Sequence, residues 1–164
     1  MQAFERHYLS GDTRLAETEF SRATSEIART GRGDLLARAE LVRCAARTAS
    51  LEFDGCPGFE ALRADAAREE LAYAEYLAGH TERAATEAPL SRLVAAGVRL
   101  KTARITPLEI AAAVELASLQ GWRRPLLAWL GVQAKRAEEA GDEEAVARIR
   151  RRIDIITGAA PARN

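Results

Sequence analysis

Long apolar runs and net charge are both missing from this chain of 164 residues. A membrane-spanning helix needs about 20 consecutive apolar residues, and no such stretch occurs. Lysine and arginine together number 24, as do aspartate and glutamate, so the formal net charge is zero. A protein without a net charge does not steer nucleic acid or an anionic membrane toward itself. The sequence therefore predicts no nucleic-acid partner and no membrane contact through a spanning helix.

Catalytic and cofactor-binding patterns are missing as well. The chain has neither the Gly-x-Ser-x-Gly turn of a serine hydrolase nor a glycine-rich phosphate-binding loop. Its two histidines, His7 and His80, lie far apart and next to no nucleophile, and with only two cysteines they do not have the spacing of a zinc site. Glutamates and arginines alternate at helical spacing near the C-terminus, which is typical of solvated helix faces. We therefore expect no enzyme, no catalytic residue, no metal ligand and no cofactor.

Aromatic residues make up only 5% of the chain, and the abundant residues favour helix. Ala, Leu, Glu and Arg lose little rotamer freedom in a helix, and apolar residues recur at helical spacing. The expected helices cover about 3–9, 13–30, 34–50, 57–78, 89–101, 107–120, 124–140 and 143–157. Short connections favour antiparallel neighbours, so we predict an all-α stack of antiparallel α-hairpins with about seven or eight helices. We expect one domain over residues 1–158, a flexible joint at 80–88 and a disordered tail at 159–164.

The start of the chain is abrupt. Ala3 to Leu9 already has a helical pattern, with Phe4 and Tyr8 four residues apart, and no capping residue precedes it. We expect that the native chain begins earlier, with a removed leader or a lipid-anchor segment. We also expect that the protein is tethered to a membrane through such a missing N-terminal anchor.

The only two cysteines are Cys44, in an expected helix, and Cys56, after the loop-like Phe53-Asp54-Gly55. No Cys-x-x-Cys redox motif is present. A chain that leaves the helix near Ser50 can fold back so that the two Cα atoms come within the roughly 4.4–6.8 Å that a disulfide requires. The alternative is a pair of buried free thiols in a cytosolic protein. We predict the disulfide, and with it an oxidising compartment.

One segment, "YLSGDTRLAETEFSRA", resembles a tetratricopeptide repeat. It has Gly-Asp in a turn, followed by Ala16, Phe20 and Ala23 at the spacing of that motif. The C-terminal "WLGVQAKRAEEAGDEEAVARIRRRI" is a degenerate relative with Arg150 in the aromatic position. The resemblance implies a right-handed superhelix of hairpins, with an irregular bundle as the alternative. It also implies that Phe20 is buried between the helices before and after it.

A longer resemblance concerns the Cys44/Cys56 segment, "PLSRLVAAGV" and "QGWRRPLLAWLGVQ". Together these look similar to uncharacterised putative lipoproteins of proteobacterial cell envelopes. That resemblance implies export to the periplasm or cell envelope, and it assigns no activity to any residue.

Candidate binding residues come from the few aromatics. Trp129 lies mid-helix among leucines in the helix expected to be the most buried, so we expect it in the core. Trp122 follows Gly121 and precedes Arg123 and Arg124, which leaves it room to reach the surface. We predict that Trp122, Arg123, Arg124 and Tyr76 contact a protein or peptide partner in a non-enzymatic interaction module. The alternative is a carrier of a lipid or small apolar ligand in a pocket between helices.

Overall fold

The computed structural model describes residues 1–159, and all regular structure in that range is helical. The elements are α1 (Gln2–Ser10), α2 (Thr13–Ala28), α3 (Gly33–Ala49), α4 (Pro57–Glu60), the 3₁₀-helix η1 (Arg63–Asp65), α5 (Arg68–Ala78), α6 (Pro89–Lys101), α7 (Pro107–Leu119), α8 (Arg123–Glu139) and α9 (Glu143–Thr157). The all-α prediction is confirmed. The predicted disordered tail falls, apart from Ala159, outside the described residues.

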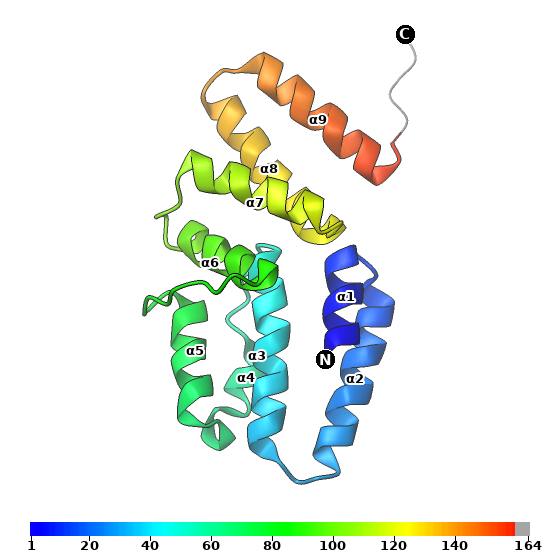
Figure 1. Ribbon diagram of the computed structural model, residues 1–164, viewed down its shortest axis with the longest axis vertical. Helices are drawn as coiled ribbons and strands as arrows, with labels where there is room; N and C mark the ends of the chain where they lie inside the picture. The colour runs from blue at the N-terminus through cyan, green and yellow to red at the C-terminus, as the bar shows by residue number, and fades with distance from the viewer. Residues whose placement is uncertain (160–164) are drawn as a thin grey trace.

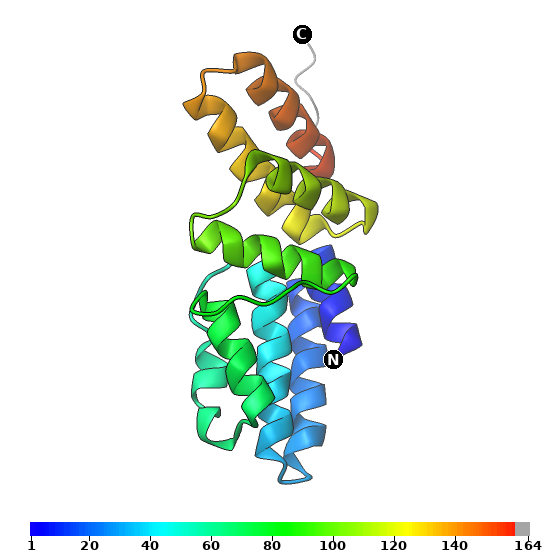
Figure 2. The ribbon, with the colours of Figure 1, turned by 60° about the vertical axis from the view of Figure 1, so that its left-hand side comes forward.

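The helices stack along the long axis of an elongated molecule (Figure 1). α3 is central to one half, where it contacts α1, α2, α4, α5 and α6. α6 lies across the end of α3, and α7, α8 and α9 follow beyond it as successive hairpins (Figures 1 and 2). Gly97 permits this crossing, because a Cβ on Gly97 would collide with the backbone carbonyl of Thr48 on α3.

The core has two parts that meet at α3 and α8. The larger part joins α3 and α5–α8 around Trp129, which is 0% exposed and donates its indole Nε1–H to the Ala49 carbonyl at 3.1 Å. The smaller part joins α1 and α2 around Phe4 and Phe20, whose rings meet edge to face at 5.2 Å. The predictions that Trp129 and Phe20 are buried are confirmed.

Four connections between helices share one backbone geometry. Each has a glycine with positive φ, followed by a residue with φ near −85° and ψ near 85°: Gly11-Asp12, Gly31-Arg32, Gly121-Trp122 and Gly141-Asp142. Two of the four carry a side-chain cap, since Asp12 accepts from the Leu15 N–H and Asp142 from the Ala145 N–H. An L side chain rarely adopts that positive φ, so the glycines set the positions of these hairpins.

The expected single helix over 57–78 is wrong, because the chain reverses within it. α4 and η1 lead away from the disulfide, and α5 returns along α3 (Figure 1). Arg63 holds the reversal together with ion pairs to Glu60 at 2.9 Å and to Glu75 at 3.1 Å. The reversal allows Phe59 and Leu77, which one straight helix would carry far apart, to enter the same core.

Two expected apolar stripes are less buried than their patterns indicate. Leu15 on α2 is 41% exposed, although its neighbours Ala16 and Phe20 are buried. On α9 the stripe Val146, Ile149, Ile153 and Ile156 is only half-buried, because α9 packs mainly against one neighbour, α8. A stripe that its own chain covers incompletely is open to further contacts.

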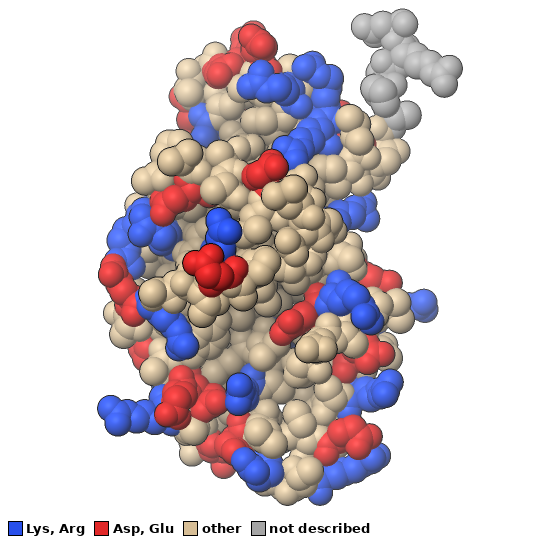
Figure 3. All heavy atoms as spheres, viewed as in Figure 1, with Lys and Arg blue, Asp and Glu red and all other residues tan. Residues whose placement is uncertain are grey.

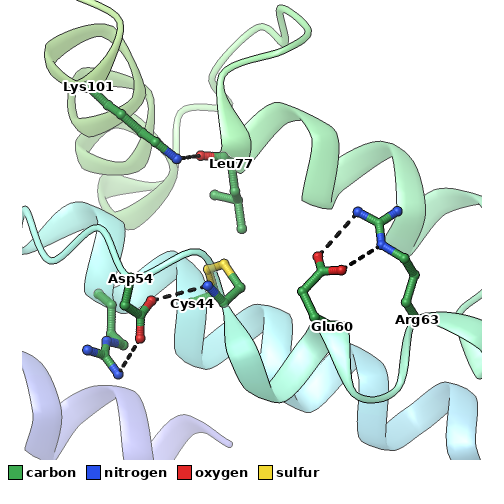
Figure 4. The surroundings of a disulfide bond; sticks show 8 residues. Cys44, Asp54, Glu60, Arg63, Leu77 and Lys101 are labelled. Carbon is green, nitrogen blue, oxygen red and sulfur yellow. Dashed lines mark hydrogen bonds and ion pairs between the residues drawn. A yellow bond between two sulfur atoms is a disulfide. The ribbon is translucent and has the colours of Figure 1, made fainter.

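The predicted disulfide between Cys44 and Cys56 is present. Their Cα atoms lie 5.5 Å apart, within the usual range, and the bond joins the last turns of α3 to the start of α4 (Figure 4). Asp54 stabilises the intervening loop, since its carboxylate accepts from the Cys56 N–H at 3.2 Å and pairs with Arg47 at 2.8 Å. A disulfide is compatible with an oxidising extracellular compartment.

Thiol titration tests this bond. Unreduced, denatured protein is expected to show no free thiol. The double change Cys44→Ser and Cys56→Ser is expected to lower the free energy of unfolding by about 3 kcal/mol, because the bond closes a loop of about a dozen residues. Two titratable thiols in unreduced material would contradict both the bond and the compartment.

No helix among residues 1–159 combines the length and apolarity that crossing a membrane requires.

Candidate functional site

The predicted binding residues Trp122, Arg123 and Arg124 lie at the start of α8, where it meets α1. Trp122 is half-buried and touches both parts of the core. Arg123 is exposed. Tyr76 is buried on α5 and belongs to other surroundings. The structure thus places three of the four candidates together and the fourth elsewhere.

Arg124 is occupied by contacts within the chain. Its guanidinium lies 4.2 Å above the Tyr8 ring, donates to the Tyr8 carbonyl at 2.8 Å and pairs with Glu52 at 3.2 Å. Glu52 also pairs with Arg47 at 3.5 Å. Arg124 therefore ties α1 and the end of α3 to α8.

Replacing Arg124 tests this role. Arg124→Ala is expected to lower the free energy of unfolding by about 1.5–3 kcal/mol, since it removes charge-assisted hydrogen bonds to two segments. Arg123→Ala is the matched control, because the neighbouring side chain is exposed and has no described partner, and we expect a change within about 0.5 kcal/mol. The measurement is the urea midpoint of each variant. An equal, small effect in both would show that Arg124 is free for a partner.

Tyr76 borders a hollow of about 340 Å³ between α5, α6 and residues 81–84. Arg99 and Arg104 line it too, but each is paired, with Glu109 at 2.8 Å and Glu82 at 2.6 Å. Residues 80–88 form no helix and are exposed. That these residues act as a flexible joint stays a prediction. Arg83 lines the hollow as well and lies over the Tyr73 ring at 5.2 Å. The lining is therefore basic, with Glu82 as its carboxylate, and two of its three arginines are already paired.

The largest described hollow, about 490 Å³, is a groove between α7 and α9. α7 and α9 both pack on α8 and run in the same general direction (Figures 1 and 2). Arg152 joins them at one end, where it donates to the Ser118 hydroxyl at 2.9 Å. The lining residues are Pro107, Ile110, Leu130, Gln133, Arg136, Ala137, Ala145, Arg148, Ile149 and Arg152. A volume of this size is typical of ligand sites.

The groove has an apolar floor and a basic edge. Its polar lining consists of Gln133 and the arginines Arg136, Arg148 and Arg152, and it contains no carboxylate. Figure 3 shows Lys and Arg side chains gathered along the region of α9, beside uncharged surface. Arg136 has no ion-pair partner among the described residues. The groove is therefore positively charged locally in a chain of zero net charge.

Carboxyl groups with shifted pKa values lie outside the groove, each explained by its neighbours. Hydrogen bonds from His80 and Arg63 lower the pKa of Glu75. Hydrogen bonds from the Thr106 backbone and side chain lower the pKa of Glu109, which forms the capping box of α7. Burial raises the pKa of Glu40 and raises the pKa of Tyr73 to about 12. Of these groups, Glu75 pairs across the reversal before α5 and Glu109 caps the start of α7.

Within residues 1–159 no group of three or more His, Cys, Asp or Glu side chains could hold a metal ion.

Sequence reasoning missed the groove. In the sequence, the spacing of the C-terminal arginines is typical of a solvated helix face. The apolar stripe of α9, which the structure leaves half-covered, has the spacing of a fully buried face. A signal was present, because Arg148 and Arg152 alternate with Ile149 and Ile153 one turn apart, which places cations beside an apolar stripe. Only the position of α7 turns that stripe into one wall of a groove.

No family model, no curated protein and no solved structure matches this chain. The fold and the groove define its class: an all-α protein of stacked hairpins with an amphipathic groove near its C-terminal end.

Proposed function

We propose that the protein is a non-enzymatic interaction module that binds a protein or peptide partner in the groove between α7 and α9. The observation that carries the proposal is the incompletely covered apolar stripe of α9, which borders that groove. Ile149 lies in the lining, and Val146, Ile153 and Ile156 of the same stripe are only half-buried. Incompletely covered apolar surface beside a groove is a common feature of protein-binding sites.

A carrier of a lipid or small apolar ligand is the second candidate. A carrier encloses its ligand in a cavity lined by large apolar side chains. Trp129, the largest apolar side chain of α8, is instead fully packed in the core and is not in the groove lining. The groove lining alternates apolar residues with arginines and a glutamine. This composition supports a polypeptide, which offers apolar and polar groups side by side.

The disulfide supports a site of action outside the reducing cytosol. We place the protein in the bacterial periplasm or cell envelope. The resemblance of the segment around Phe20 to a tetratricopeptide repeat favours the same class of function, because stacked hairpins build concave binding surfaces.

Affinity capture tests the proposal. Envelope proteins retained by the immobilised protein are compared with those retained by Ile149→Asp and by Ala137→Phe, which place a charge or a bulky ring in the groove. Leu15→Asp is the matched control, since it changes a partly exposed leucine on α2. We expect a partner retained by the wild type and the control and lost in both groove variants. Identical sets in all four samples would contradict the proposal, and a co-purified lipid released only from groove-competent protein would favour the carrier.

A further inference from the structure

The charge of the groove points to the chemistry of its occupant. Three arginines line it, one on α8 and two on α9, while α7 contributes the apolar Pro107 and Ile110, and no carboxylate is in the lining. An occupant that satisfies both features has an apolar side with acidic groups beside it. We propose that the groove binds an acidic amphipathic α-helix of the partner, an inference that rests on the proposed function.

The arginines are available to such a helix. Arg136 has no ion-pair partner among the described residues. Arg148 has only Glu144, 3.5 Å away, whose side chain is 91% exposed. An exposed pair of this kind contributes little and is readily exchanged. Arg152 uses one Nη2 contact, to Ser118, and an arginine has five N–H donors.

The shape favours a helix over a smaller anion with an apolar tail. The half-buried apolar residues of α9 continue beyond the groove lining, through Ile153 to Ile156. A fatty acid would cover the groove and leave that stripe exposed. A helix that lies in the groove and continues over the Arg152–Ser118 contact would cover both, with its apolar face in the groove as in other amphipathic-helix complexes.

Peptide selection tests the proposal without knowledge of the partner. The folded protein is used to select from displayed random peptides about four to five helical turns long. We expect enriched sequences with apolar residues at i, i+3, i+4 and i+7 and with Asp or Glu beside them. For the best peptide, the double variant Arg136→Glu, Arg148→Glu is expected to weaken binding by about tenfold or more, since two attractions become repulsions.

A reciprocal change and a matched control complete the design. Replacing the peptide's acidic residues by lysine is expected to restore binding to the double variant and to abolish binding to the wild type. Arg6→Glu, Arg14→Glu is the control, because both side chains are exposed on α1 and α2 and have no described ion-pair partner. Circular dichroism verifies that each variant is folded. Equal weakening by the control pair would overturn the proposal.

The outcomes separate this inference from the proposed function. If the selected peptides are neutral or basic, and bind the wild type but not the Ala137→Phe variant, the proposal of an acidic helix is overturned and the groove remains a peptide site. Enriched peptides that Ala137→Phe does not affect, or no enrichment, would overturn both. Suppose instead that no peptide is enriched and that laurate binds the wild type saturably but binds neither Ile149→Asp nor Ala137→Phe. That result would overturn both the acidic helix and the proposed function in favour of a carrier.

Discussion

Trp129→Ala is expected to lower the free energy of unfolding by about 3–5 kcal/mol. The indole is fully buried at the centre of the larger core, and its N–H bonds to the Ala49 carbonyl of α3. Truncation leaves a cavity between α3 and α8 and an unpaired carbonyl. The measurement is the urea midpoint together with the denaturant slope. Trp129→Phe keeps most of the volume and loses the hydrogen bond, so its cost should be smaller.

Trp122→Ala is the comparison within the same helix. Trp122 is half-buried at the first turn of α8, so we expect a clearly smaller loss than at Trp129. Each alanine variant leaves a single tryptophan, and iodide should quench Trp122 more strongly than Trp129. Equal shielding and equal loss of stability would place both rings in the core and would remove Trp122 as a candidate for partner contact.

Phe20→Ala is expected to cost about 3–5 kcal/mol as well. Its ring is 4% exposed, meets Phe4 of α1 edge to face and lies under the Arg43 guanidinium of α3 at 4.6 Å. Three helices therefore lose contacts at once. Leu15→Ala on the same helix is the control, with an expected change below about 1 kcal/mol. A loss below about 1 kcal/mol at Phe20 would mean that α2 does not depend on this face.

Features with local causes could be predicted from the sequence. Gly-Asp before a helix sets the turns at residues 11 and 141, the helical spacing around Phe20 and Trp129 identifies buried faces, and the short loop before Cys56 brings it back to Cys44. Each depends on about one or two turns of chain, over which backbone geometry and side-chain period decide the structure.

Features that depend on contacts between distant parts of the chain could not be predicted from the sequence. The reversal between α4 and α5 depends on α3 as a shared neighbour of Phe59 and Leu77. The sequence predicts Arg124 as a residue that contacts a partner, because the groups it binds within the chain, Tyr8 and Glu52, are far away in the sequence. The groove depends on the separation of α7 from α9, which packing on α8 sets. Spacing within one helix carries none of this information.

Site-specific photo-crosslinking in living cells that produce the protein tests the central claim, that this groove holds a polypeptide, most directly. A benzophenone side chain replaces Gln133, which lies in the groove lining, or, as the control, the exposed Arg14 on α2. Mass spectrometry then identifies what is attached after irradiation. The account predicts one polypeptide crosslinked at position 133 through an acidic helical segment, and none at position 14. A lipid-sized adduct at position 133, or the same products at both positions, would contradict it.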